Sequence, residues 1–144
     1  MTATFIVPGR PVPKARPRVT RWSTYTPITT VEYEERIFAA WSAAGAIQFP
    51  ADTPLSIYVE ARFPIPKGTS RRRAALMEGT WHTNHRGDVD NIIKAVQDAL
   101  NGHAYPDDCT ICDVRGKKLW SATPGTTIII QTIEEEQTYA AETD

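Results

Sequence analysis

Acidic and basic side chains gather in one short segment, Gly87 to Asp98, with the sequence Gly-Asp-Val-Asp-Asn-Ile-Ile-Lys-Ala-Val-Gln-Asp. Asp88 and Asp90 stand two residues apart where an extended run enters a helical pattern, and side chains two apart on an extended chain point to the same side. Lys94 follows Asp90 by four residues, which is one helical turn. The segment therefore predicts two carboxylates and one ammonium group on a common surface.

A second acidic pair, Asp107 and Asp108, follows Tyr105-Pro106 after a chain reversal at Gly102. A helix of about ten residues is about 15 Å long, and five or six extended residues cover a similar distance back. We therefore expect Asp107 or Asp108 to rejoin the first pair. Crowded carboxylates raise one another's pKa unless a cation lies between them, and oxygen ligands favour Mg²⁺ or Mn²⁺. Such an ion, beside the cations of the basic segments described below, indicates phosphodiester hydrolysis, with Lys94 stabilising the charge that develops on the phosphate.

The same residues also fit a purely structural role. Asp90 could serve only as a helix cap, and Asp90, Lys94 and Asp98 could form i,i+4 pairs worth about 0.2–0.5 kcal/mol each. Asp107 and Asp108 after a proline are also typical of a turn. Spacing alone leaves both interpretations open.

Positive charge is concentrated in two segments. The first 30 residues hold five basic residues and no acid, and prolines at 8, 11, 13 and 17 predict an extended arm that stays outside any sheet. The second segment surrounds a short predicted helix capped by Ser70. A solvated basic surface is one interpretation; the other is contact with DNA phosphates by Arg10, Lys14, Arg16, Arg18, Arg21, Lys67, Arg71, Arg72 and Arg73. Trp22, within the arm, either stacks on an unpaired base or is half-buried.

The periodicity of apolar residues predicts the elements that must position these groups. Period-two alternation or β-rich composition predicts strands at residues 3–8, 55–63, 110–120 and 126–133. Helical spacing predicts three helices: one that ends near residue 44, a short one over residues 71–77, and one from Asp90 to about residue 101. The first is expected to begin at a cap, Thr29 or Thr30, with glutamates in its first turn and Trp41 in the core. The fold class is therefore α+β: one domain with a mixed sheet of about four strands packed with two main helices.

Length and composition place limits on the class of protein. The 144 residues suit one domain, residues 1–133, followed by an acidic tail, 134–144, that we expect to be disordered. Without the five tail acids the net charge of −1 becomes +4. No signal peptide and no apolar run of about 20 residues is found, so we expect a cytoplasmic protein without membrane contact. Zinc binding by Cys109 and Cys112 with His82 and His85 is disfavoured, because residues three apart on a strand face opposite sides.

These motifs together resemble the signature of the RusA family of Holliday-junction resolvases. The family pattern Asp-x-Asp-Asn-x-x-Lys, then Asp-x-Leu, a glycine-containing turn and Asp-Asp matches Asp88 to Lys94, Asp98-Ala-Leu and Tyr105-Pro-Asp-Asp. The N-terminal Pro-Gly-Arg-Pro-Val-Pro-Lys-Ala-Arg-Pro-Arg and Tyr25-Thr-Pro27 also resemble many phage members. The resemblance extends to about residue 133.

The resemblance implies a RusA-like fold and a homodimeric, Mg²⁺-dependent endonuclease, with Mn²⁺ as a possible substitute and no organic cofactor. Such an enzyme makes paired symmetric nicks across a four-way DNA junction during recombination and repair. The implied metal-binding residues are Asp88, Asp90 and Asp108 with Asp107 beside them, and Lys94 is the implied catalytic lysine. The alternatives are a branched-DNA-binding module without catalysis and a metal nuclease for flaps, other branched substrates or RNA. Whether each site is built from one chain or two stays open.

Overall fold

A mixed four-stranded sheet forms the centre of the protein. The computed structural model describes residues 1–15, 17–84 and 87–134, so the predicted acidic tail after Glu134 lies outside the described residues. The strands lie in the order β1-β6-β4-β5. Their bounds are β1 (Thr2–Pro8), β4 (Leu55–Pro64), β5 (Ile111–Ser121) and β6 (Gly125–Thr132). Buried and less buried residues alternate along β1 and β4, as the period-two pattern predicts.

The crossover between two parallel strands carries most of the candidate site residues. β6 pairs antiparallel with both β1 and β4, whereas β4 pairs parallel with β5. Parallel neighbours need a long connection. Here that connection holds α2 (Arg71–Met77), α3 (Val89–Leu100) and the 3₁₀ turn η1 (Asp108–Thr110). Both acidic pairs and Lys94 therefore lie on one connection between neighbouring strands.

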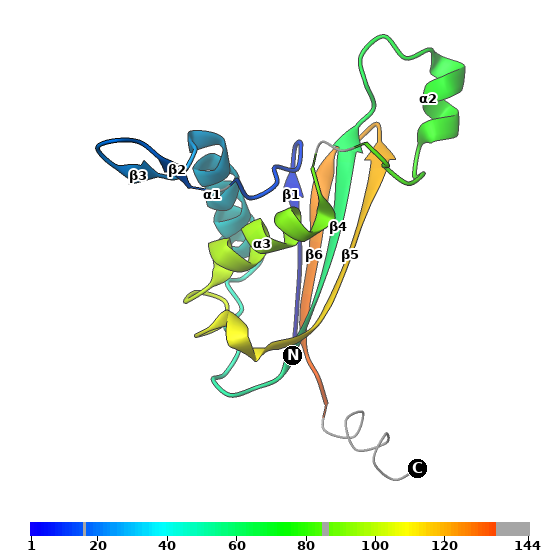
Figure 1. Ribbon diagram of the computed structural model, residues 1–144. Coiled ribbons are helices and arrows are strands. Elements are labelled where there is room, and N and C mark those ends of the chain that lie inside the picture. The colour runs from blue at the N-terminus through cyan, green and yellow to red at the C-terminus, as the bar shows by residue number, and fades with distance from the viewer. Residues whose placement is uncertain (16, 85–86, 135–144) are drawn as a thin grey trace, which may run out of the picture.

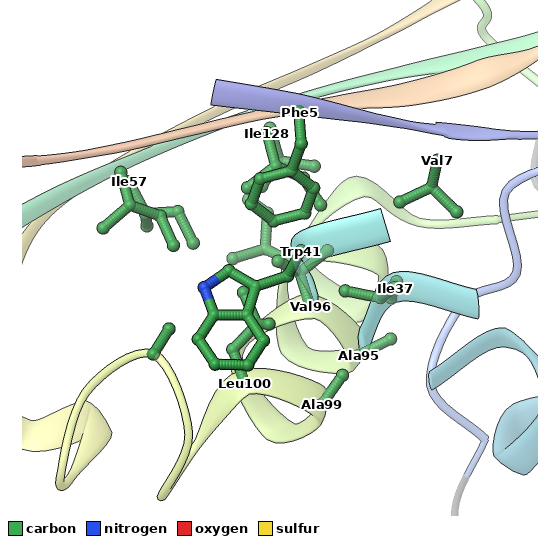
Figure 2. Close-up of a cluster of buried hydrophobic side chains, with 14 of the residues drawn as sticks. Phe5, Val7, Ile37, Trp41, Ile57, Ala95, Val96, Ala99, Leu100 and Ile128 are labelled. Carbon is green, nitrogen blue, oxygen red and sulfur yellow. The ribbon is translucent and has the colours of Figure 1, made fainter. Parts of the chain in front are cut away.

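Two helices, α1 (Ile28–Ala43) and α3, cover one face of the sheet (Figure 1). Phe5 and Ile128 from the sheet meet Trp41 and Val96 from the helices in the buried cluster of Figure 2. Trp41 is 5% exposed, and its indole nitrogen donates to the Ile47 carbonyl oxygen at 3.0 Å. The prediction of one α+β domain with two main helices and a core Trp41 is confirmed.

A close approach of α3 to β5 fixes the height of the helix above the sheet. A Cβ atom on Gly116 would lie 2.5 Å from Ile93 Cδ1 and 3.1 Å from Val89 Cγ2. Only a residue without a side chain allows this packing. The amphipathic pattern of α3 buries Ile92 and Val96 on the same side, which leaves Asp90 and Lys94 exposed.

The start of α1 differs from the sequence prediction. The N-cap is Pro27, whose carbonyl oxygen accepts the Thr30 N–H at 3.1 Å, so the helix begins at Ile28 rather than after a threonine cap. Thr30 is instead buried inside the helix, where its hydroxyl oxygen accepts the Ala15 N–H at 3.4 Å. The predicted acidic first turn is therefore wrong, because the first turn holds no acid.

Two basic segments project from the body in the upper half of Figure 1, away from the chain termini. One is α2, and the other is a hairpin of β2 (Arg18–Val19) and β3 (Thr24–Tyr25). The prolines at 11, 13 and 17 lie outside the strands, as predicted, but Pro8 is the last residue of the edge strand β1, where it pairs with Gly125. The expectation that the whole arm avoids sheet structure is therefore wrong at both of its ends: at Pro8, and at Arg18, where the prolines end and a turn lets the chain pair with itself.

In the part of the chain that the structure describes, no helix is both long enough and apolar enough to span a membrane.

Candidate active site

The first acidic pair lies at the amino end of α3. Asp88 is the N-cap residue, and its carbonyl oxygen accepts the N–H groups of Asn91 and Ile92 at 3.1 and 3.2 Å. Its carboxylate makes no capping hydrogen bond. Asp90 lies in the first turn, and both acids are exposed at the positive end of the helix dipole. Asp90 is therefore not the cap, and both carboxylates face solvent.

A tight glycine conformation places Asp88. Gly87 has φ of +104°, and a Cβ atom there would lie 2.7 Å from Cζ and 3.1 Å from Cε1 of the Phe63 ring. The Lys118 ammonium donates to the Gly87 carbonyl oxygen at 3.1 Å. The loop before α3 is thus held by a strand residue on each side.

We predict that Gly87→Ala destabilises the protein by about 2–4 kcal/mol, because it adds a clash with a buried ring to the strain of a positive φ. Gly79→Ala is the matched control: its φ is +75°, but nothing lies within 4 Å of its added Cβ. The control is expected to cost only about 1–2 kcal/mol. Urea unfolding of both variants measures the difference, and equal losses would show that the Phe63 contact is unimportant.

Lys94 belongs to a row of opposite charges that joins the helices α1 and α3 to Lys14 of the N-terminal arm. Its ammonium lies 3.3 Å from one carboxylate oxygen of Asp98, and the other oxygen lies 3.4 Å from the Lys14 ammonium. Lys14 also donates to Glu34 of α1 at 2.5 Å. Partial burial lowers the pKa of Lys14, but Glu34 and Asp98 outweigh it and leave the pKa raised. The row fixes Lys14 between α1 and α3.

The second acidic pair lies beyond the carboxyl end of α3. Asp107 caps η1 by accepting the Cys109 N–H at 3.1 Å, and this bond, with one from Asp108, holds the pKa of Asp107 below its ordinary value. Partial desolvation and the neighbouring Asp107 raise the pKa of Asp108, which the positive charge of Lys94 opposes. Asp108 is therefore the weaker acid of the two.

The two acidic pairs lie at opposite ends of α3, so the predicted return path does not occur within one chain. The Asp108 N–H donates to the side-chain oxygen of Asn101, the C-cap residue of α3, at 3.1 Å. Twelve residues of helix span about 18 Å. The chain cannot return because Ala104 and Tyr105 are buried, and the Tyr105 hydroxyl donates to the Gln97 carbonyl oxygen at 2.9 Å.

Because the two acidic pairs are separated, their carboxylates cannot bind one metal ion together within a single chain. Across residues 1–15, 17–84 and 87–134, no three His, Cys, Asp or Glu side chains are grouped so that they could hold an ion. Each end of α3 instead offers two carboxylates. The three-carboxylate set of Asp88, Asp90 and Asp108 therefore does not fit a metal ion within one chain.

The predicted DNA-binding residues fall into two groups. Lys14 is engaged by Glu34 and Asp98, and Arg16 lies outside the described residues, as does the side chain of Arg18. The remaining cations are exposed, and none of the ion pairs among the described residues involves those on α2. This exposed group is Arg10, Arg21, Lys67, Arg71, Arg72 and Arg73.

His82 is a buried residue of the core, a structural role that the sequence analysis did not predict. The His82 ring lies between Phe63 and Trp120, with ring centroids 4.5 and 4.0 Å away. Burial lowers its pKa, and its Nδ1 has no hydrogen-bond partner among the described atoms. Cys109 and Cys112 are exposed free thiols, and His85 lies outside the described residues. His82 therefore packs against Phe63, whose ring also lies beside Gly87.

Comparison with known proteins places these features in a family. The family model described as Endodeoxyribonuclease RusA matches residues 8–131. The Bacillus subtilis (strain 168) protein described as "Uncharacterized protein YqaN" is 29% identical over 136 residues, which cover 90% of this chain and 95% of that protein. The range matched by the family model includes both acidic pairs, Lys94 and both basic projections.

Proposed function

The chain belongs to the RusA family of endodeoxyribonucleases, and from this premise we propose that it resolves four-way DNA junctions by paired symmetric nicks. The observation that carries the proposal is that Asp88, Asp90 and Lys94 lie along α3, with Asp107 and Asp108 beyond its far end. We further propose that it acts in the cytoplasm during DNA recombination and repair, in a phage or prophage setting.

The side chains suit this reaction. Lys94 is 54% exposed in its side chain, so its ammonium can reach a phosphate whose negative charge grows as the bond breaks. The exposed arginines of α2 and the hairpin supply the phosphate contacts that position a DNA backbone. Mg²⁺, which prefers carboxylate and water oxygens, would supply the activation of water and the stabilisation of the pentacovalent phosphate.

A homodimer accounts for the separation of the two acidic pairs. Two copies related by a two-fold axis, with their α3 helices antiparallel, would bring Asp88 and Asp90 of one copy toward the partner subunit's Asp107 and Asp108. Two equal sites would result, which is the symmetry of two strands in a four-way junction. We propose that Mg²⁺, or Mn²⁺ in its place, is held in this shared site, because one chain does not gather three ligands among its described residues.

The function is tested with a synthetic four-way junction, a flap, a linear duplex and an RNA duplex, each with Mg²⁺ and with EDTA. Paired nicks in the junction alone, in Mg²⁺ alone, are expected. Salt-sensitive junction binding without scission in either buffer would instead favour a DNA-binding module. Faster cutting of the flap or the RNA would overturn the substrate assignment and leave the nuclease activity standing.

Mg²⁺ is expected to raise the melting temperature of the wild-type protein. At ten times the dissociation constant, binding to the folded state adds about 1.4 kcal/mol, or about 3–5 °C for a chain of this size. Asp88→Asn removes one carboxylate of the site and should reduce this rise. Equal shifts in both proteins, measured by calorimetry at matched ionic strength, would contradict a metal site that includes Asp88.

A further inference from the structure

The tip of the β2–β3 hairpin presents a tryptophan to solvent. Trp22 is 86% exposed, although an indole is among the side chains that gain most from burial. The hairpin pairs Arg18 with Tyr25 and Val19 with Thr24, and it projects away from the sheet and from α3 (Figure 1). Packing within one chain does not explain why an aromatic residue occupies this position.

The turn that carries Trp22 is held by its own hydrogen bonds. The Thr20 hydroxyl oxygen accepts the N–H groups of Trp22 and Ser23 at 3.3 and 3.0 Å. The Thr20 hydroxyl also donates to the Ser23 carbonyl oxygen at 2.9 Å, and the Thr20 N–H donates to the same oxygen at 2.7 Å. The turn is therefore ordered before any partner binds, which lowers the entropic cost of using the indole as a contact.

The charge around the indole indicates the kind of partner. The Arg21 guanidinium carbon lies 5.3 Å from the centre of the Trp22 ring, and residues 1–30 hold no acid. A cation beside an exposed aromatic ring is the combination that binds a nucleic-acid base together with its phosphate. A symmetric contact between two such hairpins would bring the arginines of both copies together, which disfavours a second copy as the occupant.

Paired bases in a duplex are stacked on both faces and offer no free face to an indole. We infer that Trp22 stacks on an unpaired base at the branch point of the DNA junction, with Arg21 on the adjacent phosphate. This inference rests on the proposed function and adds to it a residue that distinguishes branched DNA from linear DNA. It also places the hairpin over the centre of the junction.

The inference is tested with full-length wild type, Trp22→Ala and Trp22→Phe in EDTA, so that binding is measured without cutting. The probes are a four-way junction and a linear duplex, each with 2-aminopurine at the equivalent position. Trp22→Ala is expected to bind the junction about tenfold more weakly and to lose the fluorescence change, with the duplex affected less than twofold. Trp22→Phe should retain most of both signals, because a phenyl ring still stacks.

Trp81→Ala is the matched control, because Trp81 is also 67% exposed but lies outside the hairpin. It should leave junction binding and the fluorescence change unaltered. Unchanged junction binding by Trp22→Ala, an equal loss on both DNAs, or a change in oligomeric state by sedimentation would each overturn the inference. A wild-type protein that neither binds nor cuts the junction would instead overturn the proposed function, on which the inference rests.

Discussion

Asp90→Asn is expected to slow junction cleavage by about 10²–10³-fold, the order of loss when one group that stabilises a transition state is removed. The substitution keeps the size of the side chain and removes its charge. Asp90 is exposed in the first turn of α3, so the fold should survive, and junction affinity should not fall. Single-turnover cleavage at saturating enzyme, with affinity measured in EDTA, separates the two effects.

A matched control is Asp113→Asn, which removes a carboxylate from β5 that pairs only with a neighbouring arginine at 3.8 Å among the described residues. Its cleavage rate should stay within about twofold of wild type, because the surface pair contributes little. If Asp90→Asn cleaved as fast as Asp113→Asn, Asp90 would be an acid of the helix terminus with no part in the reaction.

A mixture of Asp88→Asn and Asp108→Asn is expected to cut junctions although each variant alone does not. If Asp88 of one chain works with the partner subunit's Asp108, a mixed dimer has one site with both lesions and one site with neither. Random exchange makes half of the dimers mixed, so about a quarter of all sites are intact. The product should be a junction nicked in one strand, since each active dimer has a single working site.

The control for this experiment mixes Asp88→Asn with Asp90→Asn, both at the same end of α3, which should restore nothing. Subunit exchange is checked by co-purification of differently tagged chains. Exchange without restored cutting in the first mixture would mean that each site is built within one chain. The α3 geometry would then have to change when DNA binds.

Local patterns predicted most of the elements around the site. The apolar stripe of α3 and the alternation in β4 depend on neighbours close in sequence, so both were predicted nearly to their ends. Asp88 and Asp90 were correctly placed at the start of a helix, whereas Asp107 and Asp108 were expected to return to them and instead lie beyond its far end. Their separation was not predicted, because it depends on the burial of Ala104 and Tyr105 in a core assembled from distant segments.

The parts that the sequence did not predict depend on contacts over long distances or on weak local signals. The hairpin has only two paired residues on each side, too few for a period-two pattern. Lys14 looked like a phosphate contact because its partners, Glu34 and Asp98, are 20 and 84 residues away. The exposure of Trp22 likewise depends on the direction of the hairpin, and composition does not encode that direction.

The bonds of Lys14 have a mechanical consequence. Its backbone N–H donates to the Asn91 carbonyl oxygen at 2.8 Å, and its ammonium contacts Asp98, so one residue contacts α3 at two points about two turns apart. These two contacts hold the N-terminal arm against the helix that carries Lys94. Under the proposed function, DNA bound by the arm would therefore also set the position of the helix that carries Lys94.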